Sequence, residues 1–284
     1  MGEDRLHVVF GTGQVGRALA ACLAGRGLAV RAVSGHRPPG LADGIDWRAA
    51  DATDLESASD AAKGATVVYQ CLNAPYTQWP ERFPPLQRGV LAAAERSGAL
   101  LVCLENVYGY GPAGGRPMTE DLPLAATTVK GRTRAAMTAE LLAAADAGRV
   151  RVAIRRASDF FGPGVTRGST LGERVFGHAL AGRRADFIGH PDLPNTYSYV
   201  PDIAAGLATL LTVTAGVGHS KKAARNINAW LREIAPANLP KHKLVSFHEL
   251  NLWYFGDAAR RRYFGNAARQ RTGAGIRRTD SGGF

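Results

Sequence analysis

Three glycines near the amino terminus have the spacing of a dinucleotide-binding turn. Gly11, Gly13 and Gly16 follow the pattern G-x-G-x-x-G directly after the apolar run His7–Phe10, and helically spaced apolar residues come next. Between a strand and a helix, the first glycine permits a tight turn, the second admits a pyrophosphate and the third allows close helix packing. The helix amino terminus would then face the phosphates. The expected cofactor contacts in this turn are Gly11, Gly13, Gln14, Val15 and Gly16.

The end of the second expected strand, Leu28–Val33, bears on which dinucleotide is bound. An acidic residue there would bind the ribose 2′-hydroxyl of NAD, whereas an arginine would accept the 2′-phosphate of NADP. The chain continues with Ser34 and then Arg37, without a carboxylate between them. Ser34 can donate one hydrogen bond, and Arg37 can pair with a phosphate through two. The sequence favours NADP over NAD, although Arg37 could also be a solvated loop residue.

Further cofactor contacts are expected where the third and fourth strands end, at Asp51, Ala52, Leu72, Asn73 and Ala74. A carboxylate at Asp51 could accept a hydrogen bond from the adenine amino group or from loop amides. Alternatively, Asp51 or Asp54 could N-cap the expected helix Leu55–Ala62. The fourth strand, Ala65–Leu72, is apolar and leads into the turn Asn73–Tyr76, which would border the ribose and the nicotinamide.

Strands and helices alternate along the chain, which is typical of a parallel sheet covered by helices. Later expected elements are helix Leu86–Ser97, strand Ala99–Leu104, helix Val129–Ala147, strand Val150–Ile154, a loop and helix over Thr166–Gly182, strands Ala185–Ile188 and Tyr197–Val200, and helix Ile203–Leu211 with Asp202 as N-cap. The predicted fold is an α/β, Rossmann-type doubly wound domain over residues 1–157. A small substrate-binding lobe is expected over residues 158–214, and residues 215–284 form a separate basic region.

Six motifs in this order resemble the extended or atypical short-chain dehydrogenases/reductases of the NAD(P)-dependent epimerase/dehydratase type. The motifs are GTGQVG at 11–16, DATD at 51–54, CLNAP at 71–75, ENVYGYGP at 105–112, RRASDFFGPG at 155–164 and YSYVPDIAAG at 197–206. The resemblance covers about residues 6–212. It implies hydride transfer with a bound nicotinamide cofactor, and it places the substrate near Ser158 and Asp159.

The usual catalytic residues of that family are only partly present. The family places a Ser or Thr after the fifth strand and Tyr-x-x-x-Lys on the next helix, with the tyrosine as acid/base. Here Lys130 matches the lysine, Ala126 stands in the tyrosine position, and Asn106 stands in the Ser/Thr position. An alanine cannot transfer a proton, and an amide can donate a hydrogen bond but is no acid or base at neutral pH.

Three interpretations of the chemistry remain open. Tyr108 or Tyr110 could supply the phenol, Lys130 could act with Asn106 through a water chain, or the chain could bind the cofactor without turnover. The predicted catalytic residues are Asn106, Tyr108 and Lys130, and Lys130 should also contact the ribose. The predicted function is an NAD(P)-dependent oxidoreductase or epimerase/dehydratase for a small polar substrate, with sugar derivatives as one option. The alternative is a non-catalytic NADP-sensing protein.

Charge and composition constrain the partners. The net charge of +11 divides into +2 over residues 1–219 and +9 over residues 220–284, so the basicity belongs to the end of the chain. For that basic region, a nucleic-acid partner is less favoured than a poorly ordered C-terminus. The three cysteines lack metal-ligand spacing and indicate reduced core thiols, so no metal is expected. Without an apolar run long enough for a signal peptide or a membrane span, we expect a cytoplasmic protein, and a homodimer is compatible with the sequence.

Overall fold

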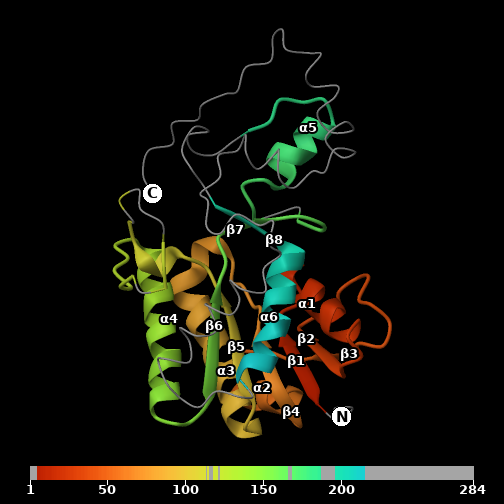
Figure 1. The fold of residues 1–284 in the computed structure, drawn as a ribbon, viewed down its shortest axis with the longest axis vertical. Coiled ribbons are helices and arrows are strands. Elements are labelled where there is room, and N and C mark those ends of the chain that lie inside the picture. Colours follow the sequence, from red (N-terminus) through yellow and green to blue (C-terminus); the bar gives the residue numbers. More distant parts are fainter. Residues whose placement is uncertain are drawn as a thin grey trace. The chain divides into compact units, whose positions relative to one another are not determined.

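The computed structural model describes residues 5–112, 114, 118–120, 122–165, 168–186 and 196–214. These residues belong to two compact units. The first unit runs to Ala157 and includes the helix that begins at Val200, and the second unit comprises Ser158–Tyr199 (Figure 1). The expectations for residues 215–284, and for the second half of the strand expected at Ala185–Ile188, lie outside the described residues.

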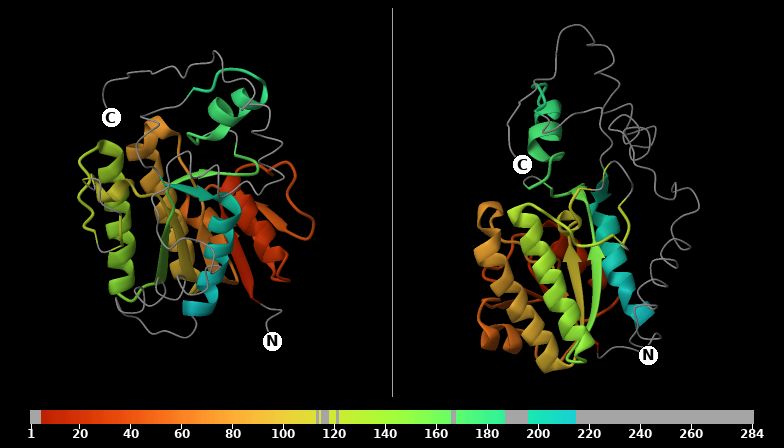
Figure 2. Two further views of the ribbon diagram at one scale, coloured as in Figure 1. Left: turned by 45° about the horizontal axis from the view of Figure 1, so that its top comes forward. Right: turned by 90° about the vertical axis from the view of Figure 1, so that its left-hand side faces the viewer.

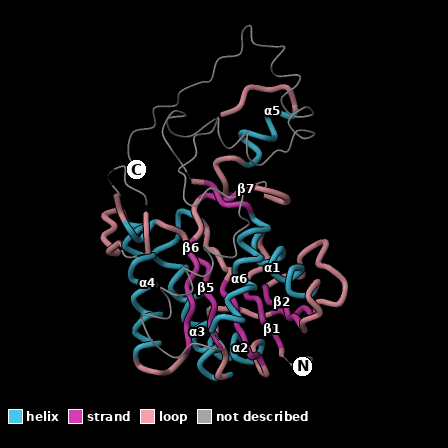
Figure 3. The backbone as a smooth tube through the Cα atoms, in the orientation of Figure 1, coloured by secondary structure: helices cyan, strands magenta, loops and turns pink. Residues whose placement is uncertain are grey.

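The first unit is built on a six-stranded parallel sheet with the strand order β3-β2-β1-β4-β5-β6. Figure 3 draws the strands in magenta. The strands are β1 Leu6–Phe10, β2 Val30–Ser34, β3 Asp46–Ala49, β4 Ala65–Gln70, β5 Leu100–Glu105 and β6 Arg151–Arg156. The strand order reverses between β1 and β4, and open α/β sheets bind ligands beyond the carboxyl ends of their strands at such a point. The Rossmann-type architecture expected from the sequence is confirmed.

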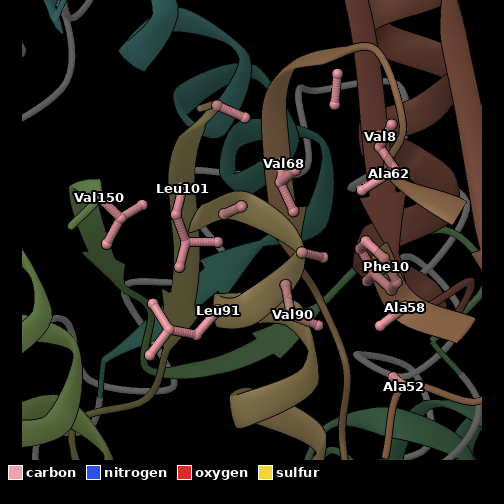
Figure 4. Close-up of a cluster of buried hydrophobic side chains, with 14 of the residues drawn as sticks. Val8, Phe10, Ala52, Ala58, Ala62, Val68, Val90, Leu91, Leu101 and Val150 are labelled. Carbon is pink, nitrogen blue, oxygen red and sulfur yellow. The ribbon is translucent and has the colours of Figure 1, made fainter. Parts of the chain in front are cut away.

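Helices cover both faces of this sheet. Helices α1 (Gln14–Ala24) and α6 (Val200–Thr214) pack together on one face, while α2 (Leu55–Ala61), α3 (Trp79–Ser97) and α4 (Val129–Asp146) lie on the other (Figure 2). A buried hydrophobic cluster joins strand residues such as Phe10 and Leu101 to Ala58 and Val90 of the helices (Figure 4). Burial on both faces explains why the central strands β1, β4 and β5 are largely apolar.

Helix α3 begins at Trp79, whereas the proline-rich sequence had suggested that it begins at Leu86. Pro80 fits the first turn, where the amide hydrogen has no partner within a helix. Pro84 and Pro85 each remove a donor from the helix. Trp79 and Phe83 are nonetheless buried on the inner side of this segment. Burial of two aromatic side chains stabilises the helix by more than the lost hydrogen bonds cost. Local sequence patterns do not predict that burial, so the expected helix began too late.

The expected N-cap at Asp202 is wrong, because α6 begins at Val200 and Asp202 lies in its first turn. An acidic side chain in the first turn still interacts favourably with the helix dipole. It also interacts electrostatically with Arg155, whose pKa is lowered by burial.

The second unit contains a short pair of strands. Strand β7 (Asp159–Phe161) pairs in parallel with β8 (Tyr197–Tyr199). A π-helical turn, Gly172–Gly177, and the short helix α5, His178–Leu180, follow β7. Among the described helices of both units, none has the length and apolar character needed to cross a bilayer.

Candidate functional site

The three glycines after β1 are required for three different reasons. Gly11 has φ +95°, and a Cβ there would lie 2.6 Å from the carbonyl oxygen of Cys71. A Cβ on Gly16 would overlap the carbonyl oxygen of Gly11. Gly13, the N-cap of α1, has φ −70° and open space where its Cβ would project. Gly11 and Gly16 therefore close the turn against the protein, and only Gly13 leaves room for a ligand.

A cavity of about 710 Å³ lies at the carboxyl ends of the strands, next to this turn. Its volume falls within the range of small-molecule and cofactor sites, about 300–1,000 Å³. The lining residues come from the carboxyl ends of β1, β2 and β3, from the segments after β1, β2, β3 and β4, and from one position of α3: Phe10, Gly11, Thr12, Gly13, Val33, Ser34, Gly35, Ala49, Ala50, Asp51, Ala52, Cys71, Leu72, Asn73 and Leu86. The open space beside Gly13 and the adjoining helix amino terminus fit a pyrophosphate.

Seven of the predicted cofactor contacts line this cavity: Gly11, Gly13, Ser34, Asp51, Ala52, Leu72 and Asn73. The other six are not among the residues that line it: Gln14, Val15, Gly16, Arg37, Ala74 and Lys130. Val15 and Ala74 are buried, whereas Arg37 is exposed two residues beyond Gly35. Sequence reasoning did not name the other eight lining residues as contacts: Phe10, Thr12, Val33, Gly35, Ala49, Ala50, Cys71 and Leu86. All of these except Ala49 and Leu86 adjoin a residue that it named.

Asp51 and Asp54 have different roles. Asp54 N-caps α2, with its Oδ1 accepting hydrogen bonds from the amides of Glu56, at 2.9 Å, and Ser57, at 3.4 Å. Asp51 lines the cavity, and its Oδ1 accepts from the backbone amide and the hydroxyl of Thr53 at 2.8 and 2.7 Å. These hydrogen bonds, above all the one from the Thr53 amide, lower the pKa of the Asp51 carboxyl. Asp51 thus presents a carboxylate at the cavity.

Ser34, at the end of β2, has its hydroxyl engaged within the protein. The hydroxyl donates to the carbonyl oxygen of His36 at 2.8 Å and accepts from the indole nitrogen of Trp47 at 3.1 Å. These bonds shape the short loop that leads to Arg37.

The loop after β5 separates the two tyrosines considered as acid/base. The side-chain oxygen of Asn106 accepts from the backbone amide of Tyr108 at 3.1 Å, and the Tyr108 ring is 37% exposed. Tyr110 is buried, and its hydroxyl accepts from Arg156 Nη1 at 2.6 Å. Burial raises the pKa of Tyr110. Tyr108 is the more exposed of the two phenols, while Tyr110 anchors the loop to β6.

Lys130 lies in the first turn of α4. The helix is N-capped by Thr128, whose hydroxyl accepts from the amide of Gly131 at 3.1 Å. Lys130 Nζ lies 4.1 Å from the centre of the Tyr76 ring. Ala126 precedes the N-cap, and its amide donates to the carbonyl of Gly109 at 3.2 Å. The residue four before Lys130 is therefore outside the helix as well as without a phenol.

A buried ionic cluster, which sequence reasoning missed, holds α4 and β6 against the end of β5. Thr138 Oγ1 donates to the carboxylate of Glu105 at 2.9 Å. Arg134 Nη2 and Arg156 Nε lie 3.7 and 3.3 Å from the same carboxylate. Arg134 and Glu105 are both almost fully buried, and buried charges need such pairing. The cluster fixes the elements that carry Tyr108 and Lys130.

Ser158 and Asp159, expected near the substrate, belong to the second unit. Ser158 Oγ lies 3.0 Å from Ser198 Oγ, and Thr170 Oγ1 donates to Asp159 Oδ2 at 3.1 Å. Across the described parts of both units, no group of three or more His, Cys, Asp or Glu side chains could hold a metal ion.

Comparison with known proteins links this geometry to one family. A family model for the NAD dependent epimerase/dehydratase family matches residues 8–227. None of the curated proteins compared with the chain matches it.

Solved structures of several epimerases share the fold. UDP-N-acetylglucosamine 4-epimerase from Bacillus cereus is 16% identical, with 79% of this chain and 81% of that chain covered and a TM-score of 0.64. UDP-glucose 4-epimerase from Thermus thermophilus, in complex with NAD, is 18% identical, with 79% and 82% covered and a TM-score of 0.62. UDP-glucuronic acid 4-epimerase from Bacillus cereus, also with NAD, is 17% identical, with 73% and 74% covered and a TM-score of 0.62.

Proposed function

The chain belongs to the NAD dependent epimerase/dehydratase family, and we propose that it is an NAD(P)-dependent oxidoreductase or epimerase/dehydratase acting on a small polar, sugar-derived substrate. The observation that carries this proposal is the cavity at the carboxyl ends of the strands, with Gly13 open beside the amino terminus of α1. The solved relatives named above act on UDP-sugars, which makes sugar nucleotides the first substrates to test.

The cavity residues would hold the parts of the cofactor in sequence along the sheet edge. The backbone at Gly13 and the first turn of α1 would bind the pyrophosphate. The Asp51 carboxylate would accept from the adenine amino group, and Leu72 and Asn73 would border the second ribose. When bound, the nicotinamide supplies hydride transfer.

NADP is the preferred cofactor in this proposal. No carboxylate follows β2 between Ser34 and Arg37, so the segment lacks the group that would bind the 2′-hydroxyl of NAD. Arg37 is exposed two residues beyond Gly35, which lines the cavity. A guanidinium there can pair with a phosphate through two hydrogen bonds.

Tyr108 would exchange a proton with the substrate, and Lys130 would stabilise the charge and contact the ribose. Asn106 would orient the loop, because its side chain already holds the Tyr108 amide. Tyr108→Phe should lower kcat by about 10²–10⁴-fold with little change in NADPH affinity, as expected for loss of a general acid/base. Lys130→Ala should weaken both NADPH binding and turnover.

The test begins with fluorescence titrations of the protein with NADPH and NADH. A panel of UDP-sugars and simple carbonyl compounds is then incubated with the protein and the cofactor, and products are identified by NMR. Conversion of one panel member supports the proposal. Tight NADPH binding without any conversion would overturn the enzymatic proposal and favour a binding protein, and absence of binding would overturn the cofactor site as well.

A further inference from the structure

Two tyrosines from different loops bring their hydroxyl groups together near Lys130. Tyr76 follows β4 in the short 3-10 helix Tyr76–Gln78, and Tyr108 follows β5 in the 3-10 helix Tyr108–Tyr110. Their hydroxyl oxygens lie 3.3 Å apart. We infer that Tyr76 and Tyr108 form one acid/base pair, with Lys130 as its cation, in place of the phenol that is absent at Ala126. This inference rests on the proposed function.

A buried tryptophan fixes the positions of both phenols. Trp79 is almost fully buried, and its indole nitrogen donates to the carbonyl of Ala74 at 3.1 Å. The centre of its ring system lies 5.3 Å from that of Tyr76 and 5.5 Å from that of Tyr108. Aromatic pairs at such distances attract one another. Trp79 is therefore a positioning residue that holds two exposed rings in one geometry.

The phenols are accessible, and Lys130 lies directly over one of them. Tyr76 is 47% exposed and Tyr108 is 37% exposed, so a substrate can reach either hydroxyl. Lys130 Nζ lies 4.1 Å from the centre of the Tyr76 ring, within the range of a cation–π contact. An ammonium group at that position attracts the negative charge left on the pair when one proton departs.

The proton exchange balances within the pair and the substrate. In the anionic pair, one phenolate oxygen takes the proton of a substrate hydroxyl, and the electrons of the broken O–H bond remain on the substrate oxygen. In the reverse direction, the neutral pair returns a proton to that oxygen. The second phenol donates a hydrogen bond to the phenolate in the anionic state. Hydrogen bonds of this kind often shorten when a substrate is bound, so a separation of 3.3 Å suits the free protein.

Nitration by tetranitromethane tests the pair without any substrate, because the reagent attacks the phenolate form of tyrosine. Rates at Tyr76 and Tyr108 are measured by peptide mass spectrometry in the wild type, Tyr76→Phe, Tyr108→Phe and Lys130→Met. Each Phe variant keeps its ring against Trp79. Lys63→Met is the matched control, since Lys63 is an exposed lysine after α2. We expect nitration of the remaining phenol to slow by about tenfold in each Phe variant, because a hydrogen bond to a charged group is lost.

Lys130→Met should slow nitration of both phenols, whereas Lys63→Met should leave both rates unchanged. Equal nitration rates in the wild type and in all variants would overturn the pair. Circular dichroism and thermal unfolding of each variant check that the fold persists. Nitration of the other tyrosines in the same digest provides the internal reference.

Turnover separates this inference from the proposed function. With a substrate in hand, Tyr76→Phe should lower kcat about as much as Tyr108→Phe does, with unchanged NADPH affinity, and the double variant should lose no more than the worse single variant. If Tyr76→Phe keeps the wild-type kcat, the inference fails and the proposed function stands. If the wild type converts nothing, but nitration of the remaining phenol slows in each Phe variant, the proposed function is refuted and the pairing of the two phenols is supported.

Discussion

At the scale of single residues, the glycine pattern after β1 contains one position that faces open space and two that face the protein. A Cβ added at Gly11 or Gly16 would overlap backbone atoms, and no rearrangement of side chains could relieve that overlap. Gly13 meets only open space. The same substitution should therefore affect cofactor binding at Gly13 and the stability of the fold at Gly16.

Gly13→Val should abolish NADPH binding and leave the fold largely intact, because the new side chain would fill the space beside the amino terminus of α1. Gly16→Val should instead destabilise the protein by about 3 kcal/mol or more, since its Cβ overlaps the carbonyl oxygen of Gly11. Fluorescence titration with NADPH and urea unfolding of both variants provide the measurements. Equal NADPH affinity in the wild type and Gly13→Val would reject the cofactor site.

Arg37→Ala should weaken NADP binding far more than NAD binding, by about 1.5–3 kcal/mol, because only NADP carries the phosphate that Arg37 would pair with. Arg26→Ala is the control with the same change of charge. Arg26 is exposed between α1 and β2, at the opposite edge of the sheet. If the dissociation constants of both cofactors change alike, or neither changes, the preference for NADP has no basis.

At the scale of the elements, the sequence predicted the strands of the main sheet, most clearly the central β1, β4 and β5, because parallel strands buried on both faces are largely apolar. It placed helix α4 within one residue of its observed bounds, Val129–Asp146. It missed the first two turns of α3, because the prolines there disfavour a helix in sequence-based prediction. Burial of Trp79 and Phe83 stabilises the helix in the folded protein. It also missed the meeting of Tyr76 and Tyr108, which are 32 residues apart in the chain. Local patterns carry no information about such contacts.

The packing of α3 against the loop after β3 depends on one glycine. A Cβ on Gly89 would overlap the carbonyl oxygen of Ala52, a residue of the cavity wall. In an exposed helix, alanine would be more favourable than glycine by about 1 kcal/mol. The overlap with a backbone atom is the larger effect here, because α3 or the loop after β3 must shift to relieve it.

Gly89→Ala should therefore lower the free energy of unfolding by about 2 kcal/mol and also weaken NADPH binding. Arg88→Ala, at the neighbouring exposed position of the same helix, breaks only a surface ion pair with Glu140 and should cost less than about 1 kcal/mol. Urea unfolding and NADPH titration of both variants compare the two changes. A Gly89→Ala protein more stable than the wild type would contradict the close packing.

At the scale of the whole molecule, the described residues form two compact units, and the main sheet belongs to the first. His7 lies in β1, between β2 and β4, with only 1% of its surface exposed. Its Nδ1 lies 3.4 Å from the hydroxyl of Tyr69, and the two rings are stacked. Burial, helped by the charge of Arg5, lowers the pKa of His7 from 6.5 to about 4. The folded chain therefore keeps this imidazole neutral.

This buried imidazole should make the fold sensitive to mild acid. Between pH 6.5 and about 4, the unfolded chain binds a proton at His7 that the folded chain does not bind. Protonation then favours unfolding, so the free energy of unfolding should fall by about 2 kcal/mol between pH 7 and pH 5 through this residue alone. His7→Gln, which does not titrate, should reduce this pH dependence in urea unfolding curves by that amount. His36→Gln, which removes an exposed histidine, should leave the dependence as in the wild type. A His7→Gln curve that falls as steeply as the wild type would show that other groups cause the acid sensitivity.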